Sequence, residues 1–246
     1  MPIGAIIIGD EIMRGKRQDK HMAQLIAILR SRGLTLSWCH YLGDVPELIT
    51  ATLARTLAGS DIVFSFGGIG ATPDDHTRAC AAAAAGVPLV LHPEAEAEIR
   101  GRFGADTNPN RLKMGEFPRG SSIIPNSYNR IPGFSLREHH FVPGFPIMAW
   151  PMVEWVLDER YGQLFHRQPE AEASIVVYDS AESTLTPLME AVETKYRGLK
   201  VFSLPSVGEG GRRRHIELGV RGAPAEVPLA LAELRCGVIE LGGTLE

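Results

Sequence analysis

One loop in the sequence brings glycines, hydroxyls and carboxylates together at a spacing that suits the binding of phosphate. It spans residues 67–77 and reads GGIGATPDDHT, after a short apolar stretch and before an alanine-rich one. Glycines let the backbone bend and approach a ligand closely. A helix that begins after such a loop offers unpaired N–H groups and the positive end of its dipole to an anion. We therefore expect a phosphate-binding site formed by Gly67, Gly68, Gly70, Thr72 and Thr77.

Acidic residues lie in this loop and at two other places that suit a ligand site. Asp74 and Asp75 would repel a phosphate unless a metal ion or a proton lay between them. Asp is also a preferred N-cap residue of helices, so a capping role stays open beside a chemical one. Asp10, Glu11 and Asp44 follow apolar segments that read as strands, and open α/β sheets bind ligands at the carboxyl ends of their strands. For Asp10 and Glu11, a place in a turn is the alternative.

The elements that must position these residues alternate between strand and helix. Apolar or alternating segments predict strands over residues 3–9, 34–42, 61–66, 87–91, 121–125 and 139–142. Helical spacing of apolar residues, with proline and glycine signals at the ends, predicts helices over residues 19–32, 47–57, 77–85, 93–103 and 147–159. Residues 104–120, rich in Gly, Asn, Pro and basic side chains, give no clear pattern. The alternation is typical of an α/β fold with a mostly parallel sheet.

A second sharp turn, Val142-Pro143-Gly144-Phe145-Pro146, follows the last of these strands. A Pro-Gly turn constrains the backbone tightly, and it leaves N–H groups free where the next helix begins. The strand before the turn contains His139 and His140. Because successive side chains of a strand point to opposite faces, these two histidines cannot share one face as metal ligands.

The loop sequence resembles the GG-[TLI]-G-x-T-x-x-D-x-T signature of the molybdopterin-binding domain family, above all the form GGLGPTPDDLT of the competence-damage-inducible proteins. Other segments are similar to the same family: residues 9–12 (GDEI), 42–46 (LGDVP), 126–134 (NSYNRIPGF) and 142–146 (VPGFP). The resemblance covers residues 3–158 through sharp motifs and residues 174–236 through weaker ones. Two departures concern the ligand cleft. His21 stands where the family has an asparagine, and Met148 stands where the competence-damage-inducible proteins have an acid.

The resemblance implies a fold, a ligand and roles for several residues. The fold would be a three-layer α/β/α sandwich with a mostly parallel sheet. The ligand would be a phosphate-bearing pterin such as molybdopterin, or a nucleotide, in a cleft walled by the turn at Pro143 and Gly144 and shared by Asp10 and Glu11. Asp75 and Asp44 would hold a divalent cation (Mg, Mn or Co), which makes these two acids the candidate catalytic residues. The family also suggests a homo-oligomer.

Composition and charge exclude several classes of partner. The 246 residues carry a formal net charge of −4, and 44% of them are apolar and 22% charged, as in ordinary globular proteins. Such a chain has no general attraction to nucleic acid or acidic membranes, and no apolar run reaches the ~20 residues of a membrane helix. Three widely spaced cysteines argue for a reducing compartment, and Met1-Pro2 leads into a strand-like segment without a signal-peptide pattern. We expect a cytoplasmic protein with a small-molecule ligand.

A polar, proline-containing break near residues 168–172 predicts a domain boundary. It separates an α/β domain over residues 1–168 from a small domain over residues 169–246. In the second part, strands over 174–178, 201–204 and 214–220 and helices over 182–196 and 225–236 give the order β-α-β-β-α. This order is typical of a small α+β sandwich with an antiparallel sheet, and it resembles the middle domain of the competence-damage-inducible proteins.

Three functions stay open at this point. The first is the binding of a phosphate-bearing pterin or nucleotide in molybdenum cofactor metabolism, with nucleotidyl transfer as the reaction if the protein is an enzyme. The second is metal-dependent hydrolysis of ADP-ribose or another dinucleotide pyrophosphate, an activity associated with the competence-damage-inducible proteins; Met148 counts against it. The third is a non-catalytic regulatory or scaffold protein that keeps the loop for binding alone.

Overall fold

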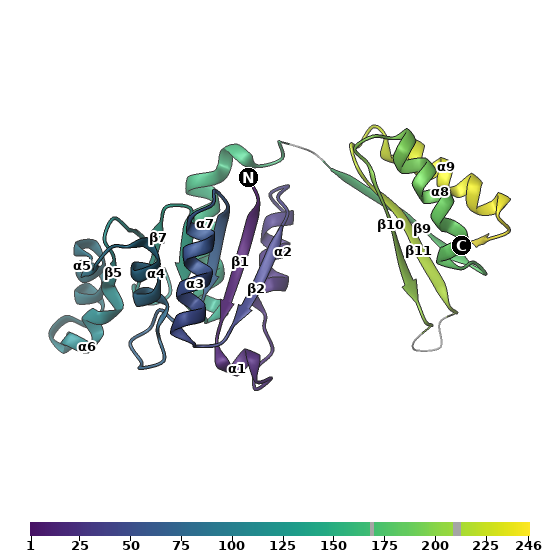
Figure 1. The fold of residues 1–246 in the computed structure, drawn as a ribbon. Coiled ribbons are helices and arrows are strands. Elements are labelled where there is room, and N and C mark those ends of the chain that lie inside the picture. Colours follow the sequence, from purple (N-terminus) through teal and green to yellow (C-terminus); the bar gives the residue numbers. More distant parts are fainter. Residues whose placement is uncertain (168–169, 209–212) are drawn as a thin grey trace. The chain divides into compact units, whose positions relative to one another are not determined.

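Two separately folded units make up the chain in the computed structural model (Figure 1). The structure describes residues 1–167, 170–208 and 213–246. The first unit is Met1–Phe165 and the second is His166–Glu246. The domain boundary predicted between residues 168 and 169 lies outside the described residues.

The first unit is built on a mostly parallel sheet. Its strands run in the order β2 (Trp38–Leu42), β1 (Ile3–Ile8), β3 (Ile62–Phe66), β8 (His139–Val142), β7 (Gly133–Leu136) and β6 (Ser122–Ile124). The strands β2, β1, β3 and β8 are parallel, and β7 is antiparallel to both of its neighbours. Every residue of β1 and β3 is buried. Burial on both faces explains their unbroken apolar runs, because the strands of a parallel sheet are covered on both sides.

Helices cover both faces of this sheet, so the predicted three-layer α/β/α sandwich is confirmed (Figure 1). Alternate residues of β1 point to opposite faces. Ile3, Ala5 and Ile7 pack in one core with α2 (His21–Arg30) and α7 (Pro146–Tyr161). Ile6 and Ile8 pack in the other core with α3 (Pro46–Leu57) and α4 (Thr77–Ala85). A short helix, α1 (Asp10–Met13), directly follows β1.

A smaller substructure lies beside the main sheet, at the left of Figure 1. In it, β4 (Leu89–Leu91) pairs antiparallel with β5 (Glu116–Pro118), and α5 (Pro93–Phe103) and α6 (Pro109–Leu112) connect the two. Short 3₁₀ helices lie at Gly104–Asp106 and Lys113–Gly115, and another follows α7 at Gly162–Leu164. The ring of Phe117 stacks on Phe134 with centroids 4.7 Å apart, and Phe134 stacks on Phe141 at 4.4 Å. These three buried rings attach the substructure to the sheet.

The two histidines of β8 point to opposite sides of the sheet, as their alternation predicts. His139 Nε2 lies 2.9 Å from the Thr56 hydroxyl on α3. On the other side, His140 lies 2.8 Å from the Ser135 hydroxyl and 2.7 Å from the Tyr161 hydroxyl. Because Tyr161 donates its own proton to Glu138, His140 must donate through Nε2 and accept through Nδ1. His140 is therefore a neutral part of the core, and the two histidines do not share one face of the sheet.

Acid is expected to destabilise the first unit through these two histidines. Burial, together with the nearby charges of Arg137 and Arg160, lowers the pKa of His139 to about 4 and that of His140 to about 3, from 6.5. Below pH 6.5 the unfolded chain binds more protons than the folded one, so stability is complete above pH 6.5 and falls as the pH falls towards 4 and 3. The slope is about 1.4 kcal/mol per pH unit for each histidine.

Urea unfolding at pH 7.5, 6.5, 5.5 and 4.5 measures this slope, and tryptophan fluorescence reports on the first unit alone, because all 3 tryptophans lie in it. The His139→Asn variant should show a shallower slope. The His166→Asn variant, which changes an exposed histidine, should keep the wild-type slope. A stability that does not change between pH 7.5 and 4.5 would contradict the assignment of two buried neutral histidines.

The second unit, over its described residues, is an antiparallel sheet packed against two helices. The strands run in the order β10 (Lys200–Ser206), β11 (His215–Gly222), β9 (Ala171–Tyr178) and β12 (Thr244–Leu245). The helices α8 (Glu182–Lys195) and α9 (Val227–Glu240) share one apolar core with β9 and β11. In neither unit, as far as it is described, is a helix long and apolar enough to cross a membrane.

Candidate functional site

The carboxyl ends of the parallel strands meet at one edge of the main sheet. Ile8 of β1 pairs with Leu42 of β2, Ile7 of β1 with Phe66 of β3, and Phe66 in turn with Val142 of β8. The loops that follow these strands therefore begin side by side, with residues 9–11, 43–44, 67–72 and 143–144. This edge is where open α/β sheets bind ligands, and it carries nearly all of the predicted site residues.

Thr77 holds the glycine loop in a shape that turns backbone N–H groups away from the protein interior. The buried Thr77 donates its hydroxyl to the carbonyl of Gly67 and its N–H to the carbonyl of Gly68, each at 3.0 Å. The C=O and the following N–H of a trans peptide point in opposite directions, so the N–H groups of Gly68 and Ile69 point away from Thr77. Among the described residues, none accepts a hydrogen bond from the N–H groups of residues 68–71.

Gly67 is required because two backbone segments meet at it. Its φ is +99°, and a Cβ at this position would lie 2.4 Å from the carbonyl oxygen of Ile8. On the other side, a Cβ on Gly144 would lie 3.5 Å from the α-carbon of Gly67, and the Gly67 N–H donates to the Val142 carbonyl at 3.0 Å. The turn at Pro143 and Gly144 therefore borders the glycine loop directly.

Asp10 and Asp44 bind each other's backbone across the ends of β1 and β2. The Asp10 N–H donates to Asp44 Oδ2 at 2.8 Å, and the Asp44 N–H donates to Asp10 Oδ1 at 3.1 Å. Asp10 Oδ2 also pairs with the exposed Arg14 at 2.7 Å. Burial raises the pKa of Asp44, and the charges of Asp10, Glu11 and Asp74 raise it further, against the opposing effect of the Asp10 N–H. The structure thus brings the predicted strand-end acids Asp10, Glu11 and Asp44 into one electrostatic group.

Asp75 turns back onto its own loop. Its Oδ2 accepts hydrogen bonds from the N–H of Thr72, at 2.8 Å, and from the Thr72 hydroxyl, and its own N–H donates to the Thr72 carbonyl at 3.0 Å. The α-carbon of Gly70 lies against this carboxylate, because a Cβ there would be 2.5 Å from Asp75 Oδ2. Asp75 therefore braces the loop, and the Thr72 hydroxyl already has a partner.

The two acids predicted to hold a divalent cation have different hydrogen-bond partners. Asp44 is joined to Asp10, and Asp75 is joined to Thr72. Within residues 1–167, 170–208 and 213–246, no three His, Cys, Asp or Glu side chains are grouped so that they could hold a metal ion. Carboxylate oxygens are the right chemical type for magnesium, so a cation at Asp44 and Asp75 stays a prediction.

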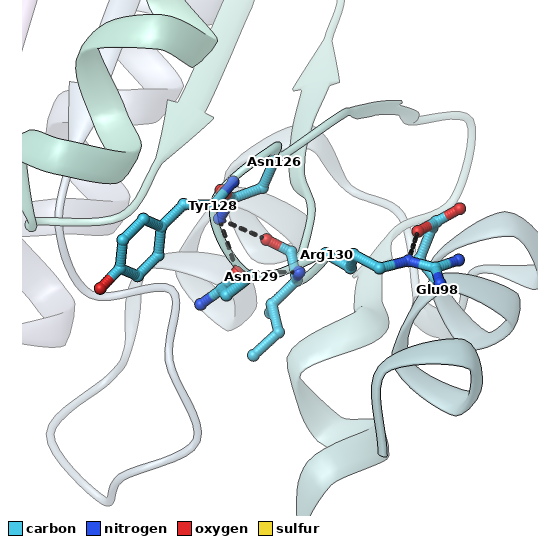
Figure 2. A network of polar contacts seen from close by, with 6 residues as sticks. Glu98, Asn126, Tyr128, Asn129 and Arg130 are labelled. Atoms are coloured by element: carbon cyan, nitrogen blue, oxygen red, sulfur yellow. Dashed lines mark hydrogen bonds and ion pairs between the residues drawn. The ribbon is translucent and has the colours of Figure 1, made fainter. Parts of the chain in front are cut away.

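A polar network fixes the loop of residues 126–131 (Figure 2). Asn126 Nδ2 donates to Asn129 Oδ1 and to the carbonyl of Ile131, both at 2.9 Å, and the Ile131 N–H donates to Asn129 Oδ1 at 3.0 Å. The Asn129 amide also reaches Sδ of Met148, in the first turn of α7, at 3.2 Å. Since α7 begins directly after the turn at 143–144, the network attaches this loop to the wall of the site.

Two other side chains of this loop point away from the network in Figure 2. Arg130, at a φ of +62°, extends to Glu98 on α5 at 2.8 Å. Tyr128 projects in another direction, and it is 61% exposed. Phe145, in the turn next to the glycine loop, is 57% exposed. The loop of residues 126–131 and the turn at 143–146 therefore each carry a large, mostly exposed aromatic residue.

His21 connects α2 to the second turn. Its Nε2 lies 3.1 Å from the carbonyl oxygen of Gly144, and its ring stacks on Phe66 with centroids 4.5 Å apart. Burial lowers the pKa of His21, although the Gly144 carbonyl and the charge of Asp19 oppose the shift. The neutral ring donates its Nε2–H to Gly144. The histidine that replaces the family's asparagine therefore holds the wall of the site in place.

The structure adds one residue that the motifs did not indicate. Arg78 is only 7% exposed, and its Nη2 donates to the carbonyl of Gly70 at 2.6 Å. The sequence does carry one signal for Arg78, which is its spacing in the helix: it lies on the same buried face of α4 as Ala81 and Ala82. An arginine on the buried face of an alanine-rich helix needs polar partners in the interior, and here the glycine loop supplies one of them.

With this geometry in hand, comparisons with known proteins give consistent results. A family model described as a probable molybdopterin binding domain matches residues 4–163. A CinA-like protein of Anaeromyxobacter sp. (strain Fw109-5) is 31% identical in an alignment that covers 90% of this chain and 60% of that protein. A CinA-like protein of Desulforapulum autotrophicum is 31% identical over 248 residues, covering 95% of this chain and 54% of that protein. This chain thus spans little more than half the length of these curated relatives.

A solved structure with a similar fold is that of the protein CinA, of unknown function, from Thermoplasma acidophilum. It superposes with a TM-score of 0.59 at 26% sequence identity. The superposition covers 65% of this chain and 98% of the other. That share is close to the share occupied by the first unit and by the family model.

Proposed function

The chain belongs to the probable molybdopterin-binding domain family, and on that premise we propose that its first unit binds the phosphate of a pterin or nucleotide at residues 67–72. One observation carries the proposal. The N–H groups of residues 68–71 have no acceptor among the described residues, while Thr77 holds the carbonyls of Gly67 and Gly68. Successive N–H groups in a bent loop before a helix form a concavity that binds anions. Molybdenum cofactor metabolism is the process that the family suggests for this ligand.

The rest of the ligand is assigned from the loops around the phosphate position. Pterins and nucleobases are flat rings, and stacking on an aromatic side chain contributes about 1–3 kcal/mol per base. Tyr128 and Phe145 offer exposed rings on the loops beside the glycine loop. A ligand with both a phosphate and a flat ring suits this combination of N–H donors and aromatic surfaces better than a sugar phosphate does.

Isothermal titration calorimetry tests the proposal on the full chain. The probes are molybdopterin, AMP, ADP-ribose, inorganic phosphate and adenosine, each with and without magnesium. We expect at least one phosphate-bearing probe to bind without magnesium, and AMP to bind more tightly than adenosine or phosphate alone. If none of the phosphate-bearing probes binds, the proposed function is wrong.

Substitution of Asp44 by asparagine should strengthen phosphate binding. The side-chain oxygen of asparagine can still accept the Asp10 N–H, so the pairing of the strand ends is kept. The change removes one negative charge from the group of Asp10, Glu11 and Asp74, and with it part of the repulsion felt by an anion. We expect affinity for AMP to rise roughly twofold to tenfold at low salt.

The matched control for this charge change is Asp106→Asn, at an exposed acid of the substructure beside the sheet, which should leave AMP affinity unchanged. Titrations with and without magnesium distinguish repulsion of the phosphate by Asp44 from the binding of a cation by Asp44. If Asp44→Asn weakens AMP binding, and does so only when magnesium is present, Asp44 acts through a cation and the metal-free reading of the site is incorrect.

Hydrolysis of a dinucleotide pyrophosphate is the second candidate, and the raised pKa of Asp44 favours it. A carboxyl group whose pKa is shifted towards neutrality suits general acid–base catalysis. The assay is AMP release from ADP-ribose with cobalt, manganese or magnesium, with Asp75→Ala as the comparison. Turnover that survives Asp75→Ala would show that Asp75 is not needed for the reaction, and turnover that also survives Asp44→Asn would place the reaction elsewhere. Tight binding without any turnover would favour a regulatory or scaffold role.

The proposal also includes the cellular compartment and the oligomeric state of the protein. Cys39, Cys80 and Cys236 are free thiols, and the proposal places the protein in the cytoplasm, where thiols are kept reduced. A homo-oligomer stays a prediction from the family. Light scattering on the purified chain at micromolar concentration measures it directly.

A further inference from the structure

Arg78 is the least accessible charged group at the candidate site. It is the second residue of α4, and its guanidinium reaches backbone carbonyl groups on two sides. Nη2 donates to Gly70 in the glycine loop at 2.6 Å. Nη1 donates to Lys113 and, at 3.4 Å, to Glu116, both near the start of β5. One side chain thus joins the glycine loop to the substructure beside the sheet.

The Arg78 guanidinium determines the direction in which the Ala71 N–H points. The peptide between Gly70 and Ala71 is trans, so its C=O and its N–H point in opposite directions. Arg78 holds the Gly70 carbonyl inward, and the Ala71 N–H must therefore point outward, away from the guanidinium. Thr77 does the same for the N–H groups of Gly68 and Ile69. Together the two adjacent residues orient three of the four free donors in residues 68–71.

The charge of Arg78 has no direct counter-ion within the described part of the chain. Its hydrogen-bond partners there are carbonyl oxygens, and its Nε, which is buried, has no partner. Burial lowers the pKa of the guanidinium, while the charges of Glu116 and Asp75 act in the other direction from a distance. Guanidinium groups stay protonated in proteins, and buried charges are normally paired. A positive charge is therefore held behind the loop without a carboxylate in direct contact with it.

We propose that Arg78 is a positioning residue of the anion site, which fixes the Ala71 donor and makes the site select its ligand by negative charge. The inference rests on the proposed function and adds a specificity to it. A doubly charged phosphate monoester gains more from a buried cation than a singly charged diester does, because the interaction scales with the ligand charge. The site should therefore prefer a terminal phosphate to a bridging one.

The test compares AMP with its phosphate monomethyl ester at pH 7.5, where AMP carries close to two negative charges and the ester carries one. Both bind through the same ring and sugar, so the ratio of their dissociation constants reports the charge preference. We expect wild-type protein to favour AMP. Arg78→Gln removes the charge and shortens the side chain, and it should weaken AMP binding roughly tenfold to a hundredfold while reducing the preference roughly threefold to tenfold.

Arg78→Lys keeps the charge but loses the fork that reaches two carbonyl groups at once. It should weaken both ligands to a similar degree and keep the preference. Arg100→Gln, at an exposed arginine paired with Glu96, is the control for the loss of one positive charge and should change neither affinity. Melting curves of each variant, recorded by tryptophan fluorescence, confirm that the first unit is folded during the titration.

Glu116→Gln tests the same charge without altering Arg78. The glutamate backbone that accepts from Arg78 is kept, and the side-chain charge that opposes the guanidinium is removed. AMP affinity should rise roughly twofold to fivefold, and more than that of the monomethyl ester. If folded Arg78→Gln and Glu116→Gln both keep the wild-type preference, Arg78 is only a structural tie and the inference fails. If wild-type protein binds neither compound, the proposed function fails first.

Discussion

Replacement of Gly67 by alanine is expected to abolish ligand binding and to destabilise the first unit by about 2–6 kcal/mol. The new Cβ would lie 2.4 Å from the carbonyl oxygen of Ile8, and the residue would have to keep a φ of +99°. Ile8 is buried in the central strand β1 and hydrogen-bonded within the sheet, so it cannot move aside cheaply. The loop must shift instead, and with it the carbonyl that Thr77 holds.

Gly86→Ala is the matched control for this prediction. Gly86 also has a positive φ, of +68°, but a Cβ there meets nothing within 4 Å. The control should cost about 1–2 kcal/mol from backbone strain alone and leave AMP affinity unchanged. Urea unfolding and calorimetry on the two variants measure both quantities. Equal losses in the two variants would show that the contact of Gly67 with β1 has no special role.

The sequence predicted the layers of the first unit because its strands and helices carry strong local signals. The alanine-rich stretch after the glycine loop forms α4, Thr77–Ala85, with the predicted bounds. The proline at position 46 begins α3, and the glycine at position 86 ends α4 in the left-handed conformation. Each of these signals acts within one turn of backbone, so no tertiary contact was needed to read it.

Segments whose structure depends on distant partners were not predicted. Residues 104–120 contain α6 and β5, each only three or four residues long, and β5 exists because β4 pairs with it. The strand β7 begins at Gly133, where a Cβ would lie 2.3 Å from the carbonyl of Phe141 in β8. Neighbouring strands, rather than local propensity, decide such elements. The strand predicted over residues 34–42 is real only from Trp38, where pairing with β1 starts.

At the candidate site too, the sequence indicated the residue types but not their hydrogen-bond partners. Residue types and strand ends indicated which carboxylates would lie at the edge of the sheet. They did not indicate hydrogen-bond partners, since Asp10 and Asp44 pair across 34 residues while Asp75 binds its neighbour Thr72. Arg78 lacked a motif, and its role follows only from the carbonyl of Gly70 that it meets.

Truncation of Ile69 to alanine is the second large effect that we expect. Ile69 lies between the free N–H groups of the glycine loop, yet its side chain is 7% exposed and belongs to the apolar core beneath α3 and α4. The side chain thus anchors the loop from inside while the backbone faces outward. Removing it should cost about 2–5 kcal/mol of stability.

Without the Ile69 side chain, the free N–H groups of the glycine loop should also become less well ordered. Thr77 and Arg78 hold carbonyl groups on both sides of Ile69, but neither fixes the position of its α-carbon. We therefore expect Ile69→Ala to weaken AMP binding roughly tenfold or more, because donors that must be ordered by the ligand bind it less well. Ile69→Leu, which conserves volume, should cost less than about 1.5 kcal/mol and keep the wild-type affinity. If Ile69→Ala loses stability but binds AMP like wild type, the loop is held by its hydrogen bonds alone, and the free donors do not depend on the core beneath them.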